Sequence, residues 1–191
     1  MIEKDALNKL IAGNKRYLAG NMQHPHQAKQ RREDLATGQQ PFACVLSCAD
    51  SRVPPEIVFD QGLGDLFVLR VAGNVVNDMI VGSLEYAVDH LGASLIVVLG
   101  HKRCGAVSAT VQGGEAPGKI GSLTQAIQPA VDAIKDQTGD IVDNAVRENI
   151  KRGVQRLKSA APVLVEKANA GQLQIVGAFY DLDTGEVTLL G

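Results

Sequence analysis

Short apolar runs alternate along the chain with longer segments of helical periodicity, and this alternation restricts the fold more than any other feature. The apolar runs cover residues 42–46, 66–71, 95–99 and 173–179. A run that is apolar on both faces of a strand indicates a strand covered on both sides. Helical patterns occupy the intervening segments 77–91, 104–112, about 122–135, 141–159 and 162–170. The sequence therefore predicts an α/β fold with a mostly parallel central sheet flanked by helices.

The two ends of the chain extend this prediction. Apolar residues at Ile2, Ala6, Leu10 and Leu18 predict an amphipathic helix over 2–18. The polar stretch 21–40 predicts a loop and a short solvated helix. At the other end, Asp181 to Gly185 predicts a tight turn into a last strand over 187–190, antiparallel to the strand before it. We therefore expect one domain spanning residues 1–191, with an N-terminal helical arm over about 2–35.

Composition and charge exclude several classes of partner. The 191 residues carry 19 Lys+Arg against 21 Asp+Glu, a net charge of −2, which does not favour binding to nucleic acid or to an anionic membrane. Apolar runs such as 95–100 are too short to cross a bilayer, and Glu3, Lys4 and Asp5 stand where a signal peptide would be apolar. We expect a cytoplasmic protein with a small-molecule substrate. Three cysteines in a chain of this size favour metal binding or thiol chemistry over a disulfide framework.

Polar residues follow two of the predicted strands at the point where each strand ends. Cys48, Asp50 and Arg52 come after the first strand, and His101 and Cys104 come after the third. Open α/β sheets present their ligand sites at the carboxyl ends of the strands. Two thiols and one imidazole form the ligand set of a catalytic zinc site, with a fourth position left for water.

A His-x-x-Cys pair alone is common by chance, and Cys48 at a second strand end strengthens the metal hypothesis. We expect Cys104 in the first turn of a helix, where the helix dipole favours the thiolate that binds a metal. Cys44 lies four residues before Cys48 on the same strand, about 13 Å away, which is too far to share a zinc ion. Cys44 is therefore predicted to be a core residue.

Two motifs make a family resemblance specific. The segments CADSRVP (48–54) and GHKRCG (100–105) resemble the two signatures of β-carbonic anhydrases. The stretch 59–74 resembles the middle of that family, and matching positions extend from about Ala6 to Tyr180.

This resemblance implies the β-carbonic anhydrase fold and one Zn²⁺ per chain, held by Cys48, His101 and Cys104. It implies the reversible hydration of carbon dioxide to bicarbonate and a proton, in which a zinc-bound hydroxide attacks CO₂. Asp50 and Arg52 would be the catalytic dyad. Arg52 can hold the Asp50 carboxylate ionised in a bidentate pair, and Asp50 can then accept the hydroxide proton and orient the oxygen.

The resemblance also implies a substrate pocket. Gln39, Phe67 and Tyr86 stand where the plant-type branch has its pocket residues, and Gly105 is expected to bind substrate as well. In that pocket Gln39 would donate a hydrogen bond to a substrate oxygen, and Phe67 would supply an apolar wall. Val45 stands where the bicarbonate-inhibited branch has a tryptophan. We therefore expect an open zinc site without that inhibitory bicarbonate pocket.

Proton transfer and assembly follow from the same resemblance. Tyr86 and His90 lie at i and i+4 of one predicted helix and match a proposed tyrosine–histidine proton relay. The resemblance implies a homodimer or a higher even oligomer, in which the N-terminal helix reaches the partner and pocket residues are shared across the interface.

Three other functions fit the sequence. Relatives of this family hydrolyse carbonyl sulfide or carbon disulfide at the same zinc site. An inactive, zinc-stabilised binding protein is a second alternative, against which the intact Asp50–Arg52 pair counts. In a third, Cys48 is a nucleophile with His101 as its base, which would require a free thiol.

Overall fold

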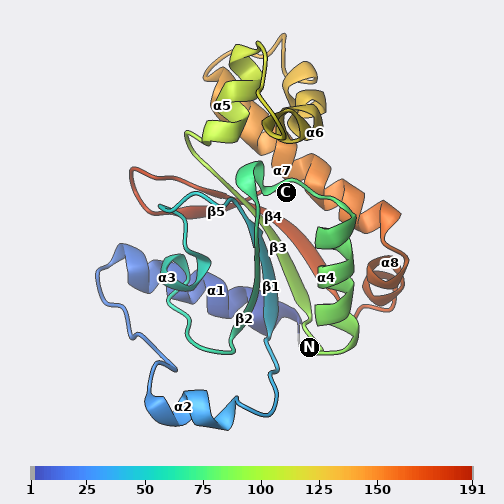
Figure 1. The fold of residues 1–191 in the computed structure, drawn as a ribbon. Coiled ribbons are helices and arrows are strands. Elements are labelled where there is room, and N and C mark those ends of the chain that lie inside the picture. Colours follow the sequence, from blue (N-terminus) through green and yellow to red (C-terminus); the bar gives the residue numbers. More distant parts are fainter. Residues whose placement is uncertain (1–2, 191) are drawn as a thin grey trace.

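The computed structural model describes residues 3–190, and its centre is a five-stranded sheet with the order β2-β1-β3-β4-β5 (Figure 1). The first four strands are parallel, and the last is antiparallel to its neighbour, which confirms the predicted fold class. The strands are β1 (Ala43–Ser47), β2 (Leu66–Arg70), β3 (Leu95–His101), β4 (Gln174–Tyr180) and β5 (Val187–Leu190).

Helices cover both faces of the sheet. The larger core lies under five helices, α4 (Asp78–Asp89), α5 (Gly105–Gln112), α6 (Ile120–Asp132), α7 (Ile141–Ala160) and α8 (Pro162–Asn169). The opposite face packs against α1 (Glu3–Leu18) and α3 (Pro55–Val58). The short helix α2 (Lys29–Asp34) has no buried residue, as its polar sequence predicts. Within residues 3–190, no helix is both long and apolar enough to span a bilayer.

Two short elements escaped prediction. The helix α3 and the 3₁₀ turn η1 (Ala72–Asn74) each have too few residues to display a helical period. Helix α4 begins at Asp78, within one residue of its predicted start. The Asn77 side chain caps it by accepting a hydrogen bond from the backbone N–H of Ile80 at 3.0 Å. Strand β3 runs two residues further than predicted and includes His101 itself.

The N-terminal helix packs on the sheet of its own chain. Leu10 is 1% exposed, and the Asn14 amide donates hydrogen bonds to the backbone carbonyls of Val58 and Gly185 at 3.1 and 2.9 Å. In this structure α1 therefore covers the sheet of its own chain, and the predicted contact of this helix with a partner stays a prediction. Ile2, at the start of the predicted helix, lies outside the described residues.

Helix α7 approaches the sheet closely because the strands beneath it carry glycine. A Cβ atom at Gly100 of β3 would lie 2.6 Å from Cδ1 of Ile150, too close for any side chain. Ile150 itself is fully buried. The close contact fixes α7 beside the carboxyl end of β3, where the polar residues of interest lie.

Candidate metal centre

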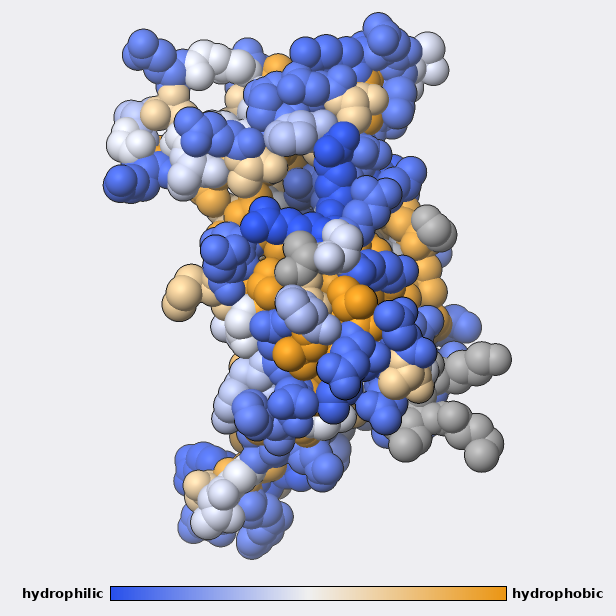
Figure 2. Space-filling model, turned by 90° about the vertical axis from the view of Figure 1, so that its right-hand side faces the viewer, coloured by the Kyte–Doolittle hydropathy of each residue, from blue (hydrophilic) through white to orange (hydrophobic). Residues whose placement is uncertain are grey.

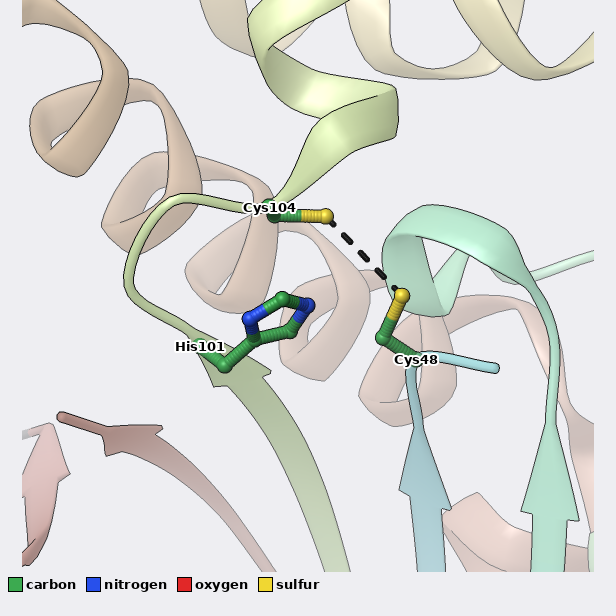
Figure 3. A group of neighbouring side chains, drawn as sticks. All are labelled: Cys48, His101 and Cys104. Carbon is green, nitrogen blue, oxygen red and sulfur yellow. Dashed lines mark hydrogen bonds between the residues drawn. The ribbon is translucent and has the colours of Figure 1, made fainter. Parts of the chain in front are cut away.

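The carboxyl ends of β1 and β3 bring two thiols and one imidazole together (Figure 3). Cys48 follows β1, His101 is the last residue of β3, and Cys104 is the N-cap residue of α5. Their ligand atoms lie within 4.8 Å of one another, and the two sulfur atoms are 3.9 Å apart. A tetrahedral zinc ion with Zn–S bonds of 2.3 Å holds two sulfurs about 3.8 Å apart, so the spacing fits zinc.

The His101 ring has one satisfied nitrogen and one free nitrogen. Its Nδ1 lies 2.9 Å from the backbone carbonyl oxygen of Lys102, which as an acceptor requires the proton on Nδ1. Its Nε2 is buried and has no hydrogen-bond partner among residues 3–190. A buried nitrogen without a partner is costly, and a lone pair on that nitrogen is what a metal ion needs. The tautomer and the orphan nitrogen therefore fit a metal ligand.

The two thiols strongly influence each other. The two sulfurs lie within hydrogen-bond distance, and this interaction lowers the pKa of Cys48 to about 4 and raises the pKa of Cys104. The backbone N–H of Gly73 also donates to the Cys48 sulfur at 3.3 Å. One thiolate is thus favoured by the protein alone. A divalent cation would stabilise the second thiolate as well.

Asp50 lies beside this cluster and is held by Arg52. The guanidinium donates to both carboxylate oxygens, from Nε to Oδ1 at 2.9 Å and from Nη2 to Oδ2 at 2.7 Å. These hydrogen bonds lower the pKa of Asp50 to about 2, so the carboxylate is ionised at neutral pH. Its Oδ2 lies 3.8 Å from Nε2 of His101, which places a fixed anion at the metal-facing edge of the imidazole.

The predicted pocket residues divide between the two ends of the sheet. Gly105 lies at the metal end, since it follows Cys104 directly at the start of α5. Phe67 lies elsewhere, because it pairs in register with Cys44, about 13 Å along β1 from Cys48. All of β1, about 16 Å of chain, lies between Gln39 and Cys48.

Tyr86 and His90 accompany Phe67 at the end far from the metal. The Tyr86 ring lies 6.4 Å from the Phe67 ring and 5.2 Å from the His90 ring, measured between centroids. His90 and Gln39 line one open surface pocket of about 480 Å³. Within one chain, four of the predicted functional residues are therefore remote from the metal cluster.

Two other predicted positions are in the core. Cys44 is fully buried, and burial raises the pKa of its thiol to about 12, so it remains protonated and outside the cluster. Val45 is also fully buried and faces the core that α1 and α3 cover.

Sequence reasoning missed residues that support the cluster through the backbone. Arg70 donates from Nε to the carbonyl oxygen of Cys48 at 3.0 Å. Gly73 was not among the predicted site residues, although its N–H donates a hydrogen bond to the Cys48 sulfur. The available signal was the position of both residues at the carboxyl end of β2, the strand next to β1.

The fold and the cluster together define an α/β protein with a candidate metal centre at the carboxyl edge of its sheet. The family model for carbonic anhydrase matches residues 43–187. Carbonic anhydrase 2 of Mycobacterium tuberculosis is 42% identical over 184 residues, covering 94% of this chain and 89% of the relative. The carbonic anhydrase of Mycolicibacterium smegmatis is 41% identical over 181 residues, covering 93% and 88%.

Solved structures agree with the sequence relatives. Among tetrameric β-carbonic anhydrases of the ascomycete Sordaria macrospora, one aligns with a TM-score of 0.78 at 26% identity and covers 98% of both chains. The chain belongs to the carbonic anhydrase family, in its β class, and is a carbonic anhydrase.

Proposed function

We propose that the chain catalyses the reversible hydration of carbon dioxide to bicarbonate and a proton, with one Zn²⁺ held by Cys48, His101 and Cys104. The observation that carries this proposal is the buried Nε2 of His101, which has no hydrogen-bond partner in the described part of the chain and lies in a cluster with two sulfurs 3.9 Å apart. Soft thiolates with an imidazole are a donor set that zinc prefers.

Zinc bound at this cluster would act as a Lewis acid that turns a water molecule into a nucleophile near neutral pH. The ionised Asp50 carboxylate would accept a hydrogen bond from a water molecule beside the cluster and so orient its oxygen lone pair toward the substrate. Arg52 fixes the Asp50 carboxylate through two hydrogen bonds and so keeps it from turning toward the metal. The catalytic roles of Asp50 and Arg52 thus depend on one rigid pair.

The substrate pocket is proposed to form between two copies of the chain. Gln39, Phe67 and Tyr86 lie at the end of the sheet away from their own metal cluster, and a second copy can place them beside it. Tyr86 is 50% exposed and Met79 of the same helix is 80% exposed, which leaves apolar surface for a partner. Figure 2 shows the side of the molecule that carries α4 and α8, where apolar side chains gather between polar ones. The related Sordaria enzymes are described as tetrameric, and an even homo-oligomer is proposed here as well.

Proton transfer is assigned to Tyr86 and His90 in the same proposal. Their rings are 5.2 Å apart, and both side chains are exposed on α4. An imidazole at the surface can exchange protons with buffer near neutral pH. In the dimer, this pair would serve the metal site of the partner.

Stopped-flow measurement of carbon dioxide hydration, together with metal analysis of the same purified chain, tests the proposal. Rapid hydration with one zinc per chain is expected. Zinc without hydration would favour an inactive binding protein, and turnover of carbonyl sulfide or carbon disulfide in place of carbon dioxide would favour the hydrolase alternative. A Cys48 thiol that reacts with iodoacetamide in active protein would favour the alternative in which Cys48 is a nucleophile.

We also propose a cytoplasmic location for the protein, which fractionation of cells would test.

A further inference from the structure

Helix α7 carries a buried polar side chain on the face that packs against the core. Asn149 is 8% exposed and lies between the buried residues Val146 and Ile150. Burying an amide costs free energy unless its polar atoms are bonded. The Asn149 Nδ2 donates a hydrogen bond to the backbone carbonyl oxygen of Gly73 at 2.8 Å.

Gly73 connects this amide to the metal cluster. Its carbonyl accepts from Asn149, and its own N–H donates to the Cys48 sulfur at 3.3 Å. The residue has a φ of +70°, and a Cβ atom there would lie 2.6 Å from Cδ1 of Ile127. Only glycine fits this position. A backbone hydrogen bond from Asn74 N–H to the Val71 carbonyl at 2.9 Å closes the η1 turn, and the contacts of Gly73 with Asn149 and Cys48 connect the turn to the rest of the molecule.

We propose that Asn149 is a positioning residue of the metal centre, which acts through Gly73 on the Cys48 sulfur. The inference rests on the proposed metal site. By holding the Gly73 carbonyl, Asn149 fixes the direction of the Gly73 N–H, and that N–H holds the sulfur toward His101 and Cys104. A hydrogen bond to a ligating sulfur also draws electron density from it, so the bond tunes how strongly Cys48 donates to the metal.

The competing explanation is that Asn149 only satisfies a buried carbonyl. Removing the amide would then lower the stability of the fold and leave the sulfur unchanged. Two variants separate these explanations. Asn149→Leu removes the donor and keeps the branching at Cγ, and Asn144→Leu is the matched control, because Asn144 of the same helix donates to the backbone carbonyl of Thr138 at 3.0 Å, away from the cluster.

The experiment replaces zinc with Co²⁺ in the full-length chain and records the thiolate-to-cobalt charge-transfer band. In Asn149→Leu we expect the band at longer wavelength than in wild type, because a sulfur without its N–H donor gives up an electron more easily. Zinc release to a chromogenic chelator should be about tenfold faster, because a sulfur that is no longer held in place weakens the site by more than its stronger electron donation strengthens it. Asn144→Leu should match wild type in both measurements.

An unchanged band and release rate in Asn149→Leu would overturn the proposal, as would equal changes in Asn144→Leu. Circular dichroism verifies that each variant is folded. If Asn149→Leu does not fold, Asn149→Ala removes the same donor with a smaller side chain and is judged by the same criteria. Failure of the wild-type chain to bind Co²⁺ would instead refute the metal site on which the inference rests.

Discussion

The cysteines of this chain differ in the surroundings and in the pKa of their thiols. Cys44 is buried in the sheet, where burial alone raises the pKa of its thiol to about 12. Cys48 shares a hydrogen bond with Cys104 and accepts another from a backbone N–H, and its pKa falls to about 4. The sequence allowed this distinction, because Cys44 lies within an apolar run and Cys48 follows it. The hydrogen bonds could not be predicted, since they come from elements remote in the sequence.

Metal content should depend on Cys104 and not on Cys44. We expect Cys104→Ser to lose most of its zinc, because the variant replaces a preferred thiolate ligand. His101→Asn should bind zinc more weakly, because the variant lacks the imidazole ligand. Cys44→Ala, a cysteine substitution outside the cluster, is the control and should retain one zinc per chain. The measurement is zinc content after gel filtration, and full occupancy in Cys104→Ser would refute the ligand assignment.

Activity should depend on Arg52 without a matching effect on metal content. In Arg52→Ala, Asp50 loses the bidentate pair that fixes its direction, and we expect carbon dioxide hydration to fall by at least about tenfold. Zinc content should remain at one per chain, because Arg52 contacts no proposed ligand side chain. Stopped-flow assays of zinc-matched samples check this. Wild-type turnover in Arg52→Ala would remove the dyad from the mechanism.

At the scale of elements, the strands were predicted because each is an apolar run bounded by polar residues, as in 95–99. The turn after β4 was predicted as well, and it folds back with the Gly185 N–H donating to the Asp181 carbonyl at 2.8 Å. The sequence did not predict that this turn forms ion pairs with residues 102 and 103, which lie between the proposed ligands His101 and Cys104. Asp183 pairs with Lys102 at 3.0 Å and also with Arg103.

Acid should weaken this tether. Hydrogen bonds from Arg103 and Lys102 lower the pKa of Asp183 from 3.8 to about 2. A carboxyl whose pKa is depressed by folding stabilises the fold above its unfolded pKa, and that contribution is lost as pH falls from about 4 toward 2. Asp183→Asn should therefore lower Tm slightly at pH 7, and the difference from wild type should shrink below about pH 4.

Thermal unfolding across this pH range, at low and at high salt, checks the prediction about the tether. The pair is exposed, so high salt should reduce the difference in Tm at pH 7. Asp5→Asn is the control, because Asp5 makes an exposed pair with Lys9 at 3.7 Å on α1, remote from the turn. A difference for Asp183→Asn that stays constant down to pH 2 would mean that the carboxylate contributes through shape and not through charge.

For the whole molecule, the distances within one chain are more informative than the motifs. The resemblance identified Gln39, Phe67 and Tyr86 as pocket residues, but a match of sequence positions does not say which copy of the chain supplies them. The register of β1 with β2 places Phe67 beside Cys44, about 13 Å along β1 from Cys48, and so separates Phe67 from the metal cluster. The same limit applies to α1, whose amphipathic pattern predicted that it packs but not on which sheet.

Two inactive variants should restore each other if the pocket forms between copies. In a hybrid of Cys104→Ser with Gln39→Ala, one of the two sites combines an intact metal cluster from one chain with an intact Gln39 from the other. Coexpression of differently tagged chains and tandem purification isolate the hybrid, and we expect up to half of the wild-type hydration activity. A hybrid of Cys104→Ser with Arg52→Ala is the control and should be no more active than Arg52→Ala itself, because one site lacks a metal ligand and the other lacks Arg52. No recovery in the first hybrid would place the pocket within a single chain.

The central claim is that carbon dioxide is hydrated at a single zinc ion in the cluster of Cys48, His101 and Cys104. The most direct measurement adds zinc stepwise to metal-free chain and records the stopped-flow rate of carbon dioxide hydration at each step. The rate should rise in proportion to zinc and stop rising at one equivalent per chain, while Cys104→Ser stays inactive throughout. A metal-free chain that hydrates carbon dioxide at the full rate, or a Cys104→Ser variant that zinc activates normally, would contradict the claim.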